Sequence, residues 1–169
     1  MLVLGIDPGT AITGYGIVRC EGAALEAVAF GVIRTSGDSL SSKLQQLYHE
    51  LRGLIARYHP TESSVEELFF ARNARTALSV GHARGVILLA LAEAHVPICE
   101  YTPLQVKQAI TGYGRADKAQ VQQMVRILLG LKAIPKPDDA ADALAIAICH
   151  ANSQTWSAHL PTAQQGQGA

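Results

Sequence analysis

LVLGIDPGT, residues 2–10, combines a short apolar run with a sharp polar turn. The first five of these residues predict a buried strand, and Asp7-Pro8-Gly9 predicts a tight turn directly after it. Two further β-rich runs follow, Thr13–Cys20 and Ala24–Thr35, with a short turn between them at Glu21-Gly22. We therefore expect the chain to open with three consecutive antiparallel strands.

The middle of the chain changes to a helical period. Leu40–Tyr58 carries apolar residues on one helical face, and Asp38 or Ser39 is available as its N-cap. The next segments predict a strand, a long apolar helix and another strand, at Ser63–Phe69, Ala74–His95 and Val96–Tyr101. Because strands alternate with helices here, right-handed crossovers and a parallel half-sheet are expected.

The C-terminal part is predicted to be helical. A short helix is expected from Pro103 to Ile110, and Asp117 is the expected N-cap of the next helix. The buried face of that second helix is predicted to carry Val121, Met124, Val125, Leu128 and Leu129. The last helix is predicted at Ala140–Ala151, and the Gln- and Gly-rich residues 152–169 are expected to form a disordered tail.

Length and composition favour one domain, residues 1–151. The chain has 169 residues, 49% of them hydrophobic and only 5% aromatic, which is typical of a layered α/β protein. No apolar run approaches the roughly 20 residues of a membrane span, and the N-terminus lacks the pattern of a signal peptide. The cysteines share no CxxC spacing and are expected to be small core residues. We therefore expect a cytoplasmic protein without a membrane partner.

The charge distribution permits binding to nucleic acid although the formal net charge is zero. Residues 68–136 contain nine Lys or Arg against three Asp or Glu, which predicts a basic face. Bound divalent cations would add positive charge that a sequence count omits. A neutral composition is therefore a weak argument against a nucleic-acid partner.

Four acidic residues stand where strands end or a helix begins: Asp7, Glu66, Asp139 and Asp142. Carboxylates from distant segments usually meet around a metal, and two Mg²⁺ ions about 3.5–4 Å apart activate water for phosphodiester hydrolysis. Asp139 and Asp142 are three residues apart, so they share one face at the start of a helix. The pattern predicts metal-dependent cleavage of a phosphodiester.

Alternatives to this metal site exist at each position. Glu66 and Glu67 point to opposite faces of a strand, so only one of them can serve, and spacing alone does not choose. Either Asp139 or Asp142 taken singly is more simply explained as a capping acid. The first loop, with Gly9 and the Thr13-Gly14-Tyr15-Gly16 run, also resembles the first phosphate loop of actin-like ATPases. Those proteins enclose a nucleotide between two domains, and this chain is too short to do so.

Several motifs in order resemble the crossover-junction endodeoxyribonuclease RuvC family: residues 4–10, 13–16, 65–66, 83–86, 105–108 and 139–145. The resemblance covers residues 1–151. It implies an RNase H-like fold, a five-stranded mixed sheet with three antiparallel and two parallel strands, flanked by helices. It also implies a homodimer that resolves four-way (Holliday) junctions by symmetric paired nicks, in DNA recombination and repair.

The resemblance also assigns residues. Asp7, Glu66, Asp139 and Asp142 match the family's catalytic metal ligands, which selects Glu66 over Glu67 and implies two Mg²⁺ or Mn²⁺ ions per site. The hydrolysis would leave 5′-phosphate and 3′-hydroxyl ends. The positions expected to contact DNA are Lys107, Lys118, Phe69, Arg72, Arg75 and Arg115. A branch-migration complex of RuvA and RuvB is the implied protein partner.

Three other functions remain alternatives. One is a module that binds junctions without cutting them, which a complete set of carboxylates disfavours. The second is an RNase H-type nuclease acting on RNA–DNA hybrids, which would share the fold and the metals. Cleavage assays on a junction and on a hybrid duplex distinguish these two from a resolvase. The third is a small-molecule phosphotransferase, which absence of nucleotide binding would exclude.

Overall fold

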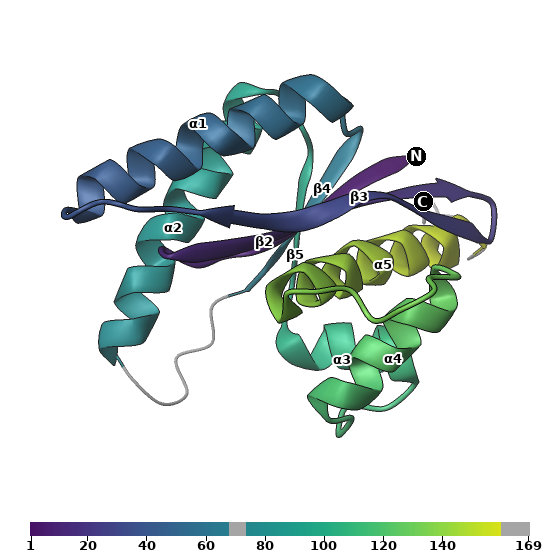
Figure 1. The fold of residues 1–169 in the computed structure, drawn as a ribbon. Coiled ribbons are helices and arrows are strands. Elements are labelled where there is room, and N and C mark those ends of the chain that lie inside the picture. Colours follow the sequence, from purple (N-terminus) through teal and green to yellow (C-terminus); the bar gives the residue numbers. More distant parts are fainter. Residues whose placement is uncertain (68–73, 160–169) are drawn as a thin grey trace, which may run out of the picture.

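A single mixed sheet organises the protein (Figure 1). The computed structural model describes residues 1–67 and 74–159, with side chains at 74–76 and 155–159 left undescribed. Across the sheet the strand order is β3-β2-β1-β4-β5, with β1 antiparallel to β2, β2 antiparallel to β3, and β1, β4 and β5 parallel. The strands are β1 Leu2–Asp7, β2 Ile12–Glu21, β3 Ala24–Arg34, β4 Glu62–Glu66 and β5 Ile98–Tyr101. The predicted five-stranded sheet of three antiparallel and two parallel strands is confirmed.

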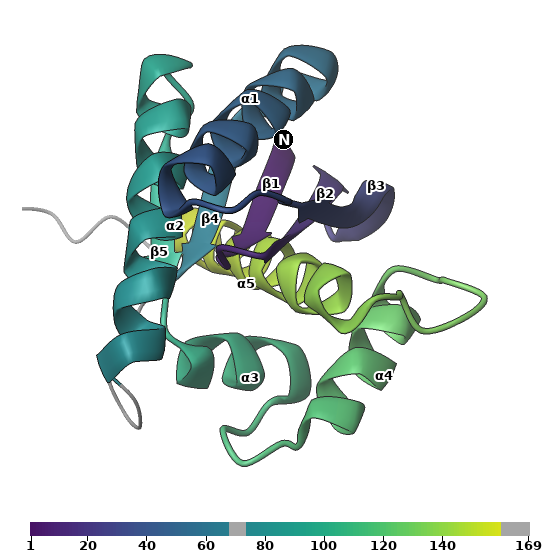
Figure 2. The ribbon, with the colours of Figure 1, turned by 60° about the vertical axis from the view of Figure 1, so that its left-hand side comes forward.

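Helices cover both faces of this sheet (Figures 1 and 2). The helices in the described residues are α1 Leu40–Tyr58, α2 Ala74–Glu93, α3 Pro103–Thr111, α4 Lys118–Leu128 and α5 Asp138–His159. Helices α1 and α2 pack on one face, while α5 packs on the other with α3 and α4 outside it. None of the helices in this described portion combines the length and hydrophobicity needed to cross a membrane.

Side-chain caps explain where several helices begin. The Ser39 hydroxyl accepts the backbone N–H of Ser42 at the start of α1. Thr102 and Asp117 open α3 and α4 with capping boxes. Each cap side chain accepts the backbone N–H of the glutamine three residues on, and each cap backbone N–H donates to the Oε1 of that glutamine. Such caps satisfy backbone donors that have no partner within the helix. The predictions that Leu40–Tyr58 is a helix and that Asp117 is a cap are confirmed.

Two predicted boundaries are wrong by three residues or more. Strand β4 ends at Glu66 and Glu67 already lies outside it, whereas the predicted strand ran on to Phe69, which lies outside the described residues. Helix α5 begins at Asp138 and continues to His159, past the end predicted at Ala151. The amide of Asn152 donates to Ala109 O of α3 at 3.4 Å, and the Ser153 hydroxyl donates to Cys149 O at 2.9 Å. These contacts extend the helix into a segment whose composition alone predicts disorder; residues 160–169 lie outside the described part.

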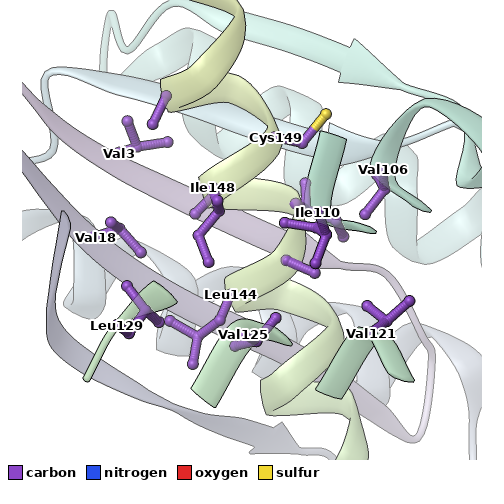
Figure 3. Close-up of a cluster of buried hydrophobic side chains, with 14 of the residues drawn as sticks. Val3, Val18, Val106, Ile110, Val121, Val125, Leu129, Leu144, Ile148 and Cys149 are labelled. Atoms are coloured by element: carbon purple, nitrogen blue, oxygen red, sulfur yellow. The ribbon is translucent and has the colours of Figure 1, made fainter. Parts of the chain in front are cut away.

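Alternating side chains of the sheet divide the core into two layers. On β1, Val3 packs toward α5, whereas Leu4 packs toward α1 and α2. Figure 3 shows the α5 layer, in which Leu144 and Ile148 of α5 contact apolar residues of the sheet, α3 and α4. The free Cys20 and Cys149 are buried in this layer, as predicted for small core residues, and Cys99 is partly buried.

Candidate active site

The carboxyl ends of two neighbouring parallel strands place two acids side by side. Asp7 is the last residue of β1, and Glu66 is the last residue of β4. Ile6 pairs with Val65 in the parallel register, so Asp7 and Glu66 are the next positions along the two strands. Functional groups of open α/β sheets gather at such strand ends.

Helix α5 brings two more acids to this end of the sheet. A Cβ atom built on Gly14, the β2 partner of Asp7, would lie 2.0 Å from Asp139 O. A Cβ on Gly5 would lie 2.2 Å from Ala143 O. Only glycine permits this approach, so the backbone of α5 rests directly on β1 and β2. Asp139 and Asp142, in the first turns of α5, therefore lie over the ends of the strands.

The strand face that meets α5 carries Glu66. The Ser64 hydroxyl donates to Ile146 O of α5 at 3.2 Å. Because side chains alternate along a strand, Glu66 shares the face of Ser64, whereas Val65 packs into the opposite layer. This geometry favours Glu66 over Glu67, the choice that spacing alone left open.

Mutual repulsion and burial perturb these acids. Burial raises the pKa of Asp7 to about 8, and the charges of Glu66, Asp142 and Asp139 add to the increase. Burial also raises the pKa of Glu66, with the charge of Asp142 as a further cause. Clusters of strongly perturbed titratable groups are typical of functional sites. The four predicted residues thus interact electrostatically as one acidic cluster.

Two lysines border this cluster. A pocket of about 250 Å³ is lined by Glu66, Asp142, Lys107 and Lys118, with apolar side chains of α3, α4 and α5 forming the rest of its wall. Lys118 Nζ lies 2.9 Å from Asp142 Oδ2. This hydrogen bond raises the pKa of Lys118 and opposes the effect of burial on Asp142. The two lysines therefore offset part of the negative charge.

Asp138 is a second partner of Lys118 that sequence analysis missed. Its carboxylate lies 3.8 Å from Lys118 Nζ and 2.8 Å from Lys136 Nζ. The hydrogen bond from Lys136 lowers the pKa of Asp138. Acid spacing on α5 gave no indication of this role, because Lys118 is 20 residues away along the chain.

The carboxylate oxygens of the cluster are suitable ligands for a divalent cation, but the described side chains do not converge on one point. Within residues 1–67 and 74–159, no three Asp, Glu, His or Cys side chains are close enough to hold one ion. Instead, Lys118 bonds one of the acids. Hard carboxylate oxygens suit Mg²⁺ or Mn²⁺, and a bound cation would relieve the repulsion that raises the pKa of Asp7.

Hydrogen bonds of hydroxyl groups fix the loop after Asp7. Thr13 Oγ1 accepts the Gly9 N–H at 3.4 Å and donates to Gly9 O at 2.7 Å. The Thr10 and Ser79 hydroxyls share a hydrogen bond of 2.7 Å, and Thr35 donates to Thr10 O. Because the Gly9 N–H is already bonded within the turn, the geometry favours a structural turn over a phosphate-binding loop.

Only some of the other residues predicted to contact DNA lie in the described part of the structure. Arg115 is exposed on the loop between α3 and α4. The backbone of Arg75 belongs to the first turn of α2, and its side chain is not described. Phe69 and Arg72 lie outside the described residues.

Comparison with known proteins agrees with this geometry. The sequence profile of the family described as "Crossover junction endodeoxyribonuclease RuvC" matches residues 3–150. The chain belongs to this family. Its members include the RuvC of Heliobacterium modesticaldum, 60% identical over 92% of this chain and 97% of that protein. The RuvC of Desulfitobacterium hafniense is also 60% identical, over 90% of this chain and 93% of its own.

Solved structures support the fold of this RuvC-family chain. Thermus thermophilus RuvC in complex with a Holliday junction substrate superimposes with a TM-score of 0.88 at 40% identity, covering 93% of this chain and 96% of that one. The yeast mitochondrial Holliday junction resolvase Ydc2, at 17% identity and a TM-score of 0.63, shares the fold. The predicted family, RNase H-like fold and enzyme class, a crossover junction endodeoxyribonuclease, are confirmed.

Proposed function

We propose that this chain resolves Holliday junctions by metal-dependent hydrolysis at the acidic cluster of Asp7, Glu66, Asp139 and Asp142. The observation that carries the proposal is the position of these acids, at the adjacent ends of β1 and β4 and in the first turns of α5 that lie over them. Burial and mutual repulsion raise the pKa of Asp7 there. Family membership supplies the reaction class, and the resemblance to RuvC supplies the four positions.

The four carboxylates would hold two Mg²⁺ or Mn²⁺ ions. When bound, such ions supply an activated water for in-line attack and stabilise the departing 3′-oxygen. Asp7 and Glu66 would provide oxygens from the ends of β1 and β4, and Asp139 and Asp142 from α5. No nucleophilic side chain is required, and the products would carry 5′-phosphate and 3′-hydroxyl ends.

Lys107 and Lys118 would hold the scissile phosphate. Both line the pocket that contains Glu66 and Asp142. An ammonium group beside this cluster offsets the repulsion between carboxylates and a phosphodiester. Of the other predicted contacts, Arg115 would bind the DNA backbone, as would Arg72 and Arg75, and Phe69 would stack on bases at the junction centre.

A homodimer formed through α2 would supply two active sites for the paired nicks. This helix exposes Leu78 and Leu89, 64% and 54% accessible, on the same stripe as the exposed Gly85. A Cβ built on Gly85 meets nothing within 4 Å, so a second helix could approach there closely. Two-fold pairing of identical surfaces would place two identical sites on one junction. RuvA and RuvB are the protein partners that the family resemblance suggests.

The decisive experiment maps incisions on a synthetic four-way junction with a mobile core, in Mg²⁺ and in Mn²⁺. We expect symmetric cuts on two strands of like polarity, with ends that DNA ligase reseals. An RNA–DNA hybrid of the same sequence should remain intact at equal enzyme concentration. Preferential cutting of the hybrid would favour an RNase H-type nuclease, and binding without cutting would favour a junction-binding module.

A further inference from the structure

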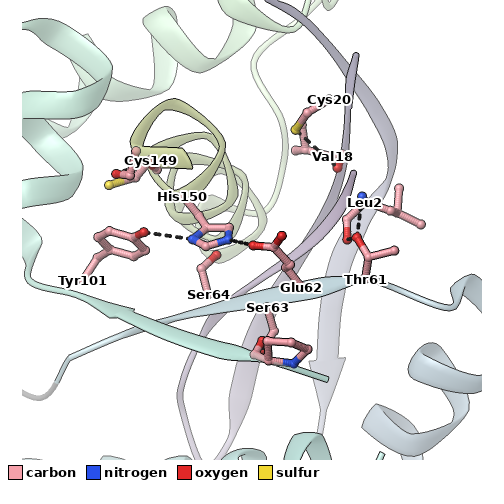
Figure 4. A network of polar contacts seen from close by, with 12 residues as sticks. Leu2, Val18, Cys20, Thr61, Glu62, Ser63, Ser64, Tyr101, Cys149 and His150 are labelled. Atoms are coloured by element: carbon pink, nitrogen blue, oxygen red, sulfur yellow. Dashed lines mark hydrogen bonds and ion pairs between the residues drawn. The ribbon is translucent and has the colours of Figure 1, made fainter. Parts of the chain in front are cut away.

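A buried polar network joins Tyr101, His150 and Glu62 (Figure 4). Glu62 begins β4, and Glu66 of the acidic cluster ends it on the same face of the sheet. His150 of α5 is fully buried. Its Nδ1 lies 2.8 Å from the Tyr101 hydroxyl of β5, and its Nε2 bonds the Glu62 carboxylate of β4. One imidazole tautomer satisfies both contacts, with Nδ1 accepting from Tyr101 and Nε2 donating to Glu62. None of these side chains belongs to the proposed catalytic set.

The network is the first of three contact points between α5 and β4. Glu62 bonds His150, Ser64 bonds Ile146 O at 3.2 Å, and Glu66 and Asp142 line the same pocket. We call these three pairs the α5–β4 row. Its strand members are two residues apart and its helix members are four residues apart. All three strand residues therefore share one face, and all three helix residues share one stripe.

The spacing of the row matches the geometry of both elements. The four steps along the strand from Glu62 to Glu66 span about 13 Å. The eight steps along the helix from His150 to Asp142 span about 12 Å. The two spans are nearly equal, so a helix antiparallel to β4 can form all three contacts of the row. Fixing one end of the row fixes where the other end falls.

Hydrogen bonds constrain this register more specifically than the small apolar side chains of α5 do. Much of α5 that faces the sheet is alanine, and Ala143 and Ala147 contact Gly5 of β1. Alanine side chains have no branches that could interlock with the strand, so they specify the register less sharply than larger side chains do. A buried imidazole with two specific partners resists such sliding, because a displaced helix would leave buried polar groups without hydrogen bonds.

We propose that Glu62, His150 and Tyr101 are positioning residues that set the register of α5 on β4 and thereby place the Asp142 carboxylate beside Glu66. Tyr101 reinforces this role, since its backbone pairs with Glu66 in the sheet while its hydroxyl reaches His150. The inference rests on the proposed metal-binding function of Glu66 and Asp142. It assigns a positioning role to residues outside the proposed metal-binding set.

The test measures Mn²⁺ affinity by calorimetry on the full chain, without DNA, beside thermal unfolding in a chelator. Glu62→Leu removes the acceptor of His150 while keeping the size of the side chain, and we expect Mn²⁺ affinity to fall about fivefold or more. Glu62→Gln retains a carbonyl acceptor and should restore affinity to within about twofold of the parent. Tyr101→Phe should give an intermediate loss.

A matched control separates register from stability. Leu51 of α1 is buried in the opposite core layer, so Leu51→Ala destabilises the fold without touching the row. This variant should lose thermal stability and keep its Mn²⁺ affinity. The inference is overturned if Glu62→Leu binds Mn²⁺ like the parent, or if Leu51→Ala loses as much affinity at an equal drop in melting temperature. Asp142→Asn reports on the proposed function itself: unchanged affinity there would refute the metal site, independently of the row.

Discussion

Asp7 is the residue on which burial and three neighbouring acids act together. Its carboxyl group loses hydration at the end of β1, and Glu66, Asp139 and Asp142 oppose its ionisation. A group with a folded pKa raised above its unfolded value destabilises the folded state wherever the unfolded chain would ionise it. The same repulsion favours binding of a cation. Ionised Asp7 thus lowers the stability of the metal-free fold, whereas the proposed metal binding would require it.

Asp7→Asn should therefore stabilise the metal-free protein while abolishing nicking. The unfolded pKa is near 3.8 and the folded pKa is about 8. The destabilisation by Asp7 is absent below the first value, grows between the two and is complete above the second. At pH 7.5 we expect the variant to gain about 2–4 kcal/mol in unfolding free energy, measured by urea denaturation in a chelator. A gain that does not increase between pH 5 and pH 8 would contradict the assignment, as would persistent nicking by the purified variant. Junction affinity serves as the control and should change little.

Lys118 would compete with the proposed metal for Asp142 in the free protein. Its Nζ lies 2.9 Å from Asp142, and its side chain is 56% exposed, so the ion pair contributes at most about 1 kcal/mol. Lys118→Met should raise Mn²⁺ affinity in the absence of DNA by up to about fivefold, measured by calorimetry, while junction cleavage falls. Lys136→Met is the matched control, because Lys136 pairs with Asp138 and none of the four proposed ligands. Weaker Mn²⁺ binding by Lys118→Met would mean that the lysine supports the metal site instead of competing for it.

At the scale of elements, the position of α5 determines whether the acids meet. Gly5 and Gly14 allow the helix backbone to lie directly on β1 and β2, and the α5–β4 row fixes its register along β4. If a methyl group separated α5 from the sheet, Asp139 and Asp142 would both move away from the strand ends. Close packing of cores makes such a displacement costly.

Gly5→Ala tests this dependence on close approach. The added methyl would lie 2.2 Å from Ala143 O, so α5 must shift. We expect a loss of about 1–3 kcal/mol in unfolding free energy and a drop in nicking of at least tenfold, measured on a junction at a temperature where the variant is folded. Gly53→Ala in α1 meets nothing within 4 Å and should stabilise the protein by up to about 1 kcal/mol with unchanged activity. Parental activity in folded Gly5→Ala would show that the site tolerates displacement of the helix.

Local patterns were sufficient to predict most elements, because local physical chemistry specifies them. The apolar period and the cap of α1 gave its bounds, and Asp117 correctly marked the start of α4. Contacts between distant residues were not predictable. Glu62 and His150 are 88 residues apart, and no pattern in either segment indicates their hydrogen bond. The end of α5 was missed for the same reason, since Asn152 bonds Ala109 on another helix.

At the scale of the whole molecule, the sheet separates two surfaces with different roles. One side bears α5, the acidic cluster and its lysines, and the other bears α1 and α2 (Figure 2). The exposed leucines of α2 therefore lie on the side of the sheet away from α5 and its core layer. The Thr10 hydroxyl nevertheless bonds Ser79 of α2, so the loop after Asp7 contacts the proposed dimer helix directly.

Leu89→Glu should separate the proposed dimer and uncouple the two nicks. A charge on this stripe of α2 would be buried without a partner in a two-fold interface, which costs several kcal/mol. Light scattering should then report the monomer mass, and a supercoiled plasmid carrying an extruded cruciform should accumulate nicked circles before linear product. Ile127→Glu on α4 is the matched control, because Ile127 is 53% exposed and Leu89 is 54% exposed, but the two lie on opposite sides of the sheet. If Leu89→Glu keeps the parental mass and cuts both strands together, the dimer does not form through this face of α2.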